Sequence, residues 1–192
     1  METRPMYGPE LVGAVNLARY TYENSIEEPT DNPMQKQFFL QYVEANNIIN
    51  LVDYKRLVVF GTFNDVGELV AVSAINSMGY ITMLYILPQY QWQGIGKRMI
   101  RIMELYAYSN WKLNSVRINV TPANRQIYFA NRGFMPMNVM QGGNMAYCEM
   151  FKPIDFGKNK YISRPLNKKV TAAVICSGLV LCNVFAWICC II

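Results

Sequence analysis

A glycine-containing loop, Trp92-Gln93-Gly94-Ile95-Gly96-Lys97, follows an apolar segment that stops at Pro88 and precedes a segment of helical periodicity. Glycines at a strand-to-helix junction let backbone amides converge on an anion, and the first turn of the helix adds the positive end of its dipole. Gly94 and Gly96 lack side chains that would block a phosphate, and Lys97 supplies a countercharge. The pattern predicts a pyrophosphate-binding loop, with an ordinary strand-to-helix turn as the alternative.

The chemistry available to the chain is limited by composition, because the sequence contains no histidine. This excludes histidine general bases, serine–histidine triads and histidine metal ligands. Before residue 170 the only cysteine is Cys148, and no CxxC pattern occurs. We therefore expect neither a metal site nor a disulfide within the folded part.

The longer pattern over residues 84–97, a strand followed by Pro-x-Tyr-Gln-x-x-Gly-Ile-Gly-Lys, resembles the coenzyme A signature of the GCN5-related N-acetyltransferases. The resemblance covers roughly residues 9–152 and implies acetyl-CoA as cosubstrate. It implies that backbone groups of Leu84, Tyr85 and Ile86 bind the pantetheine arm. It also implies that the loop amides bind the pyrophosphate and that Gln91 closes the start of the loop. The residues so implied are Leu84, Tyr85, Ile86, Gln91, Trp92, Gln93, Gly94, Ile95, Gly96, Lys97 and Asn124.

A second family motif is similar to residues 125–134, which end in Gly-Phe, but its catalytic position differs. The tyrosine that donates a proton in the family is here Phe129, and the adjacent Tyr128 is expected to point elsewhere on a helix. Pro122 stands where the family often has asparagine, with Asn124 two residues later. Arg117 stands where relatives carry a glutamate base. The sequence therefore leaves the catalytic residues open, with Tyr128 as the only candidate.

The elements that must position these residues alternate between helix and strand. The pattern predicts helices over 9–25, 34–52, 94–111 and 123–132. It predicts strands over 57–63, 68–76, 80–87 and 115–120, and a final strand pair around Gly142-Gly143. We expect an α/β (α+β) domain over 1–152, built on a mixed, mostly antiparallel sheet flanked by helices. By the resemblance, its fourth and fifth strands splay apart to admit the thioester.

The last segment, residues 170–192, is uncharged and almost entirely apolar. As a helix it would extend about 34 Å, enough to cross a hydrocarbon core of roughly 30 Å. A buried core helix is the alternative. The segment predicts a C-terminal transmembrane anchor, joined to the domain by a basic linker over 153–169.

The charge of the chain is concentrated next to that segment. Five of the 18 basic residues lie within 158–169, and the other 13 balance the 13 acidic residues. A neutral domain argues against a nucleic-acid partner. A basic flank predicts that residues 1–169 lie in the cytosol and that 158–169 contact anionic lipid headgroups.

Two functions follow from these observations. The first is a membrane-tethered N-acetyltransferase that transfers acetyl from acetyl-CoA to an amine of a protein or small molecule near the cytosolic face. The second is a domain that has lost catalysis and serves as a scaffold, with protein partners in a membrane or in a membrane-containing viral particle. Phe129 and the lack of an evident base support the second, since we interpret Glu68 and Glu149 as solvent-facing. The intact glycine loop supports the first.

Overall fold

The computed structural model describes residues 1–24, 33–120, 125–142 and 145–155. The helices in this part are α1 (Glu10–Asn24), α2 (Pro33–Tyr42), α3 (Ala45–Asp53), α4 (Ile95–Trp111) and α5 (Gln126–Ala130), with a 3₁₀ turn over Pro88–Tyr90. The strands are β1 (Glu2–Pro5), β2 (Leu57–Phe63), β3 (Leu69–Asn76), β4 (Ile81–Ile86), β5 (Ser115–Val120), β6 (Met135–Gly142) and β7 (Met145–Pro153).

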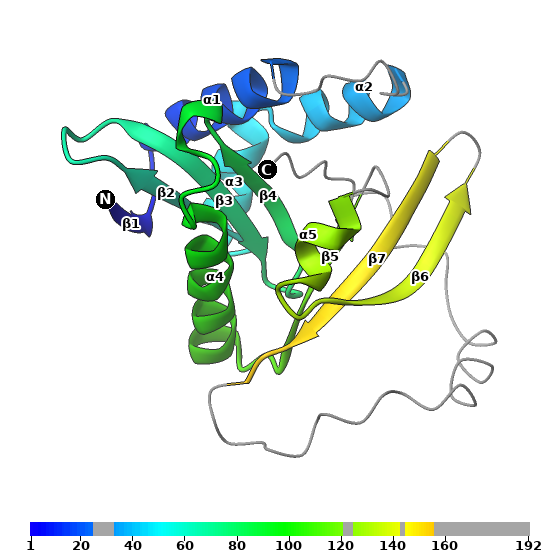
Figure 1. The fold of residues 1–192 in the computed structure, drawn as a ribbon. Helices are drawn as coiled ribbons and strands as arrows, with labels where there is room; N and C mark the ends of the chain where they lie inside the picture. The colour runs from blue at the N-terminus through cyan, green and yellow to red at the C-terminus, as the bar shows by residue number, and fades with distance from the viewer. Residues whose placement is uncertain (25–32, 121–124, 143–144, 156–192) are drawn as a thin grey trace, which may run out of the picture.

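The strands form two antiparallel sheets with the orders β1-β2-β3-β4 and β5-β7-β6 (Figure 1). The β2–β3 hairpin pairs Val59 with Ala74, and its turn is closed by the Asn64 side chain, which accepts from the amides of Val66 and Glu68. The second sheet joins the first at an isolated parallel bridge between Tyr80 and Arg117. The mixed, mostly antiparallel architecture predicted from the sequence is confirmed.

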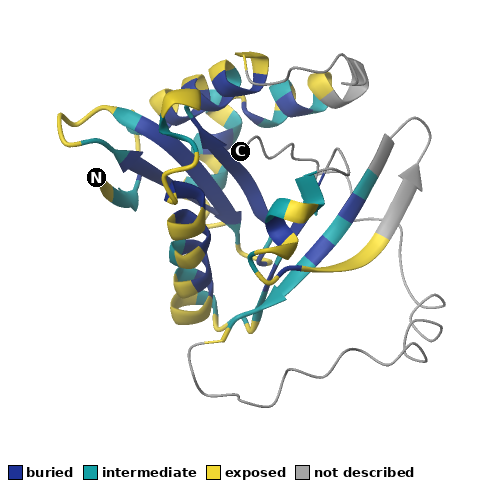
Figure 2. Ribbon diagram, viewed as in Figure 1, coloured by how far each residue is buried: buried dark blue, intermediate teal, exposed yellow. Residues whose placement is uncertain are grey.

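Helices cover both faces of the four-stranded sheet, which explains why β2, β3 and β4 are almost continuously apolar (Figure 2). Alternate residues of these strands face opposite sides. One set packs against α1, α2 and α3, as Val72 and Tyr85 do. The other set, with Leu84 and Ile86, packs against α4 and the second sheet. β5 is buried only at every second residue, because a single face of it meets this second core.

Two elements differ from those predicted. The sequence Glu-Thr-Arg-Pro carries no strand periodicity, yet it forms β1 because its backbone pairs with β2, with Thr3 opposite Thr62. The single helix expected over 34–52 is divided into α2 and α3. Glu44 has an extended backbone (φ −64°, ψ 132°), and the Asn47 side chain donates to the carbonyl of Tyr42, 2.7 Å away. A local side-chain hydrogen bond therefore replaces the helical one at this point.

Residues 156–192, which include most of the linker predicted over 153–169 and all of the anchor predicted over 170–192, lie outside the described residues. Within residues 1–155, as far as they are described, no helix combines the length and apolar character needed to cross a bilayer. The boundaries at 152 and 169 stay predictions; β7 itself runs to Pro153.

Candidate functional site

The end of β4 exposes backbone groups along one edge of the strand. The amide of Leu87 donates to the carbonyl of Val70 on β3 at 3.0 Å, so these two residues form a hydrogen-bonded pair of the antiparallel ladder. Such pairs alternate along an antiparallel ladder. Tyr85, opposite Val72, therefore turns its amide and carbonyl toward β3, whereas Leu84 and Ile86 turn theirs away from it, toward β5.

This edge faces a separation between strands. β4 and β5 meet at the Tyr80–Arg117 bridge, where the Arg117 amide donates to the carbonyl of Gly79 at 2.8 Å. Beyond the bridge, β4 belongs to one sheet and β5 to the other. Leu84 and Ile86 can thus offer backbone hydrogen bonds to a ligand lying between the strands. Tyr85, which the sequence grouped with them, cannot, because its backbone groups face β3.

The base of this separation is held by a polar cluster formed by Tyr80, just before β4, with one residue each from β5 and β7. The Tyr80 hydroxyl donates to Glu149 on β7 at 2.7 Å, and Arg117 lies 3.4 Å from that hydroxyl and 3.7 Å from the carboxylate. Burial, together with the bonded Glu149, raises the pKa of Tyr80 and keeps the phenol neutral. The side chain of Glu149 is only 16% exposed, so our interpretation of it as solvent-facing is wrong.

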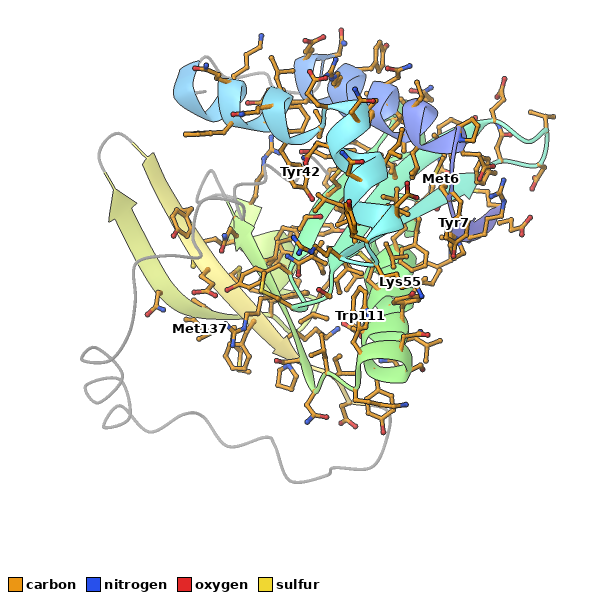
Figure 3. The ribbon with its side chains drawn as sticks, turned by 180° about the vertical axis from the view of Figure 1, so that it is seen from behind. Met6, Tyr7, Tyr42, Lys55, Trp111 and Met137 are labelled. Atoms are coloured by element: carbon orange, nitrogen blue, oxygen red, sulfur yellow. The ribbon has the colours of Figure 1, made fainter. Side chains whose placement is uncertain are left out.

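Tyr42, at the end of α2, approaches β4 from the other side (Figure 3). It packs against both hydrophobic clusters, close to the Thr82 hydroxyl. Burial raises the pKa of Tyr42 to about 12, and the nearby Thr82 hydroxyl opposes the shift. The phenol is therefore neutral at all physiological pH values, and its ring packs against the two hydrophobic clusters.

The loop after β4 is organised by its glutamines. The Gln91 side chain donates to the carbonyl of Ile86 at 3.1 Å, and that of Gln93 donates to the carbonyl of Gln89 at 3.0 Å. Between them, Trp92 has a left-handed backbone (φ +62°) and a 90% exposed side chain. A bulky residue in this region is unusual and costs free energy. Gln91 closes the loop's start, as expected, while the indole of Trp92 faces solvent.

The first turn of α4 presents unsatisfied amides. Gly94 caps the helix in a left-handed conformation (φ +79°) without a side-chain hydrogen bond. The first intrahelical bond runs from the Arg98 amide to the Gly94 carbonyl at 3.1 Å. The amides of Ile95, Gly96 and Lys97 therefore have no acceptor within the helix. Because Gly94 borders open space, these donors and the exposed Lys97 can receive a phosphate.

Gly96 is required for a different reason from the one the sequence suggested. A Cβ atom at this position would collide with the hydroxyl of Tyr128 and would lie 3.3 Å from Cδ1 of Ile86. The Tyr128 hydroxyl is thus placed where the end of β4 meets the start of α4. The expectation that Tyr128 points elsewhere is wrong, since it points at the glycine loop.

Phe129 takes the inward position of α5. Its side chain is fully buried and makes edge-to-face contacts with Tyr128 and Phe134, at centroid distances of 5.1 and 5.6 Å. Arg132 fixes the neighbouring ring: its guanidinium lies 3.1 Å from the centroid of Tyr128, and its Nη1 donates to the Tyr128 carbonyl at 2.7 Å. The five-residue helix therefore presents Tyr128, and not Phe129, to the loop.

A family model described as an acetyltransferase (GNAT) domain matches residues 16–146, which include the strands β2–β5, the glycine loop and α5. The chain belongs to the GNAT acetyltransferase family. A comparison with curated protein sequences gives no match.

Solved structures show the same fold. The PaiA N-acetyltransferase of Thermoplasma acidophilum, in complex with coenzyme A, matches with a TM-score of 0.66 at 16% identity, over 79% of this chain and 98% of that one. A GCN5-related N-acetyltransferase of Rhodopseudomonas palustris gives 0.62 at 16% identity, over 79% and 94%. A spermidine N-acetyltransferase of Vibrio cholerae, in complex with CoA and spermine, gives 0.55 at 15% identity, over 80% and 95%.

The GNAT coenzyme residues predicted from the sequence lie together, except for two. Leu84, Ile86, Gln91 and the loop through Lys97 form one continuous edge, but Tyr85 turns away from it. Asn124, like Pro122, lies outside the described residues. The sequence named Tyr128 as the only catalytic candidate but expected it to point elsewhere, whereas the structure places its hydroxyl beside Gly96. The described residues contain no group of three or more acidic or cysteine side chains that could hold a metal.

Replacing Phe129 tests its structural role. We expect Phe129→Ala to lower the free energy of unfolding by about 3–5 kcal/mol, because it removes a fully buried aromatic ring and leaves a cavity. Urea denaturation of the full chain would measure this, with Ile127→Ala on the exposed side of α5 as the control. A loss below about 1 kcal/mol would contradict the placement of Phe129 in the core.

Proposed function

We propose that this GNAT protein is an acetyl-CoA-dependent N-acetyltransferase, tethered to a membrane by residues 170–192 with its domain in the cytosol. The observation that best supports the acetyltransferase activity is that three features of the structure lie close together. These are the outward backbone edge of Leu84 and Ile86, the unsatisfied amides of the first turn of α4, and the hydroxyl of Tyr128.

Each feature supplies one part of the reaction. The first-turn amides of α4 and Lys97 suit the pyrophosphate of acetyl-CoA, and the edge of β4 suits its amide-containing arm. An outward amide of β4 can donate to the acetyl oxygen as negative charge develops there. The acceptor nitrogen then bonds to the acetyl carbon as the carbon–sulfur bond breaks. The neutral amine loses one proton to solvent, the leaving thiolate takes one from Tyr128, and solvent returns a proton to the Tyr128 phenolate.

Glu149 is not proposed as the base that deprotonates the amine. Tyr80, the hydrogen-bond partner of Glu149, lies four positions before Leu84, which is about 13 Å along an extended strand. The cluster of Tyr80, Arg117 and Glu149 instead fixes the point at which β4 and β5 separate. Positioning an amine against a bound thioester accounts for most of the rate without a dedicated base.

An amine acceptor is supported by the family and by the likeness of fold to a spermidine N-acetyltransferase. The alternative function, a scaffold without catalysis in a membrane or a viral particle, rested partly on Phe129. That support is weakened because Tyr128 places a hydroxyl at the glycine loop.

Binding and turnover test the enzyme directly. The full chain, kept in mild non-ionic detergent, would be titrated calorimetrically with acetyl-CoA and then incubated with a panel of amines, from spermidine to peptide N-termini. We expect micromolar binding and acetylation of at least one amine, detected by mass. A folded protein that binds no acetyl-CoA would overturn the proposal, whereas binding without turnover would favour the scaffold.

Membrane attachment is tested separately by flotation with vesicles. We expect the full chain to float, and a chain ending at residue 169 to float weakly and only with anionic vesicles at low salt, through the basic cluster of 158–169. Equal recovery of both chains in the floating fraction, or of neither, would contradict a tether at 170–192.

A further inference from the structure

The outer side of α4 carries a stripe of exposed cationic and apolar side chains (Figure 2). Successive members lie three or four residues apart, so they share one face of the helix over about 21 Å. Near its centre, the side chains of Leu105 and Tyr108 are 52% and 39% exposed. Cations precede and follow this pair along the helix and its C-cap. The α4 stripe consists of Arg98, Arg101, Leu105, Tyr108 and Lys112.

The α4 stripe contains no negative charge. The one acidic residue of α4, Glu104, is fully buried, and it forms ion pairs with Lys152 and Arg101. The side chain of Arg101 is still 53% exposed in this ion pair, so it presents positive charge to solvent. A helix face that combines exposed apolar groups with cations and lacks exposed carboxylates suits an anionic lipid surface.

The domain is neutral as a whole, but its charge is unevenly distributed. Residues 1–68 contain ten acidic and five basic residues, whereas residues 69–148 contain seven basic residues and a single acidic one. The helices of the first part, α1–α3, cover one face of the four-stranded sheet, and α4 covers the other. An anionic surface would attract the α4 side and repel the opposite side, which favours one orientation of the domain.

The chain leaves the described part of the domain next to the same helix. The backbone carbonyl of Asp155, an exposed residue, accepts a hydrogen bond from Arg101 at 3.3 Å. The linker from residue 156 to 169 has 14 residues, and a flexible chain of that length spans roughly 20 Å. A domain of this size has a radius of gyration of about 15 Å and is therefore about 40 Å across. An anchor directly after the linker would hold the α4 side, and not the α1–α3 side, close to the bilayer.

We propose that the α4 stripe docks the domain on the anionic bilayer that holds the anchor. Leu105 and Tyr108 lie at the level of the lipid headgroups, and the cations contact the phosphate and carboxylate groups of the lipids. The inference rests on the membrane tether of the proposed function, which brings the domain to the bilayer. Lys97 does not belong to the stripe and remains with the glycine loop. Docking thus fixes the orientation of the domain, with α1–α3 turned away from the membrane.

Hydroxyl-radical footprinting of the full chain tests the docking, because the oxidation rate of a side chain reports its exposure to water. The chain would be placed in vesicles of phosphatidylcholine with phosphatidylserine, in vesicles of phosphatidylcholine alone, and in mild non-ionic detergent. We expect Leu105 and Tyr108 to be oxidised at least about threefold more slowly in the anionic vesicles, since each cation near the surface favours contact about fivefold. Val12 and Tyr54, which are exposed on α1 and directly after α3, should show equal rates in all three.

Two double variants test whether the charge and the apolar group of the stripe are responsible. Arg98→Glu/Leu105→Glu places two carboxylates at exposed positions of the stripe and should abolish the protection of Tyr108. Lys36→Glu/Val12→Glu makes the same kind of change at exposed positions of α2 and α1 and should preserve that protection. Salt at about 0.5 M should also weaken the protection, because the Debye length falls to about 4 Å.

The outcomes separate this inference from the tether. Equal oxidation of the stripe in anionic vesicles and in detergent, in a chain that floats with the vesicles, would overturn the docking and leave the tether intact. Equal protection in neutral vesicles, or protection that persists in Arg98→Glu/Leu105→Glu, would also overturn it. Protection that rises with the number of chains per vesicle would show that a second copy of the chain covers the stripe instead. A full chain that does not float would overturn both.

Discussion

Tyr128→Phe is expected to lower kcat about 10²- to 10⁴-fold, the usual contribution of a general acid, while the affinity for acetyl-CoA stays within about twofold. The hydroxyl of Tyr128 lies against Gly96, at the junction of β4 and α4 where the thioester of the proposed complex is expected. Removing the oxygen alone leaves the ring stacked under Arg132 and edge-on to Phe129. Steady-state kinetics and calorimetric titration of the same preparation would measure the two quantities.

Two further variants sharpen that result. Tyr54→Phe removes a hydroxyl from a tyrosine exposed to solvent at the end of α3 and should leave kcat unchanged. In the Tyr128→Phe background, Phe129→Tyr restores the tyrosine at the usual family position. It should not restore activity, since position 129 faces the core and a buried hydroxyl without a partner destabilises the fold. Recovery of activity in this double variant would show that α5 presents residue 129 to the substrate.

Gly94→Glu is expected to weaken acetyl-CoA binding at least about 100-fold. Gly94 borders open space in front of the first-turn amides of α4, and a carboxylate there would occupy the position proposed for the pyrophosphate and repel it. Because acidic residues near a helix N-terminus are favourable, the variant should remain folded. Calorimetric titration would measure the loss, and circular dichroism would confirm the fold.

Gly94→Asn is the matched control for the backbone. Asparagine tolerates the left-handed conformation that Gly94 adopts (φ +79°) and adds no charge. We expect its affinity for acetyl-CoA to remain within about tenfold of the wild type. Equal losses in the two variants would mean that backbone strain, and not an anion site, explains the effect. Unchanged binding in Gly94→Glu would place the pyrophosphate elsewhere.

The sequence predicted the part of the site that depends on local structure. A strand stopped by Pro88, a loop with Gly94 and Gly96, and an amphipathic helix are encoded by neighbouring residues, so their order and the free amides at the helix start could be inferred directly. The hairpin β2–β3 followed in the same way from its turn residues, because Asn64 closes the turn on its own neighbours.

Orientation across elements could not be predicted in this way. The sequence places Tyr128 and Phe129 side by side, and only the packing of α5 against Phe134 decides which ring enters the core. Likewise, the sequence predicts that Gly96 contacts a phosphate, whereas in the structure the Tyr128 hydroxyl occupies the space beside Gly96. β1 became a strand through pairing with β2, although its own residues show no strand pattern.

The sequence by itself thus determined the family, the coenzyme loop and the neutral charge of the domain, since each is a property of residues close together in the chain or of composition. Tertiary structure decided which residues join that loop. The hydroxyl of Tyr128, on α5, lies beside Gly96, and Arg132, just after α5, lies over the Tyr128 ring. α5 follows β5, which pairs with β4 only at the Tyr80–Arg117 bridge and otherwise belongs to the second sheet. Contacts between segments so far apart depend on side-chain packing, which no spacing of residues along the chain encodes.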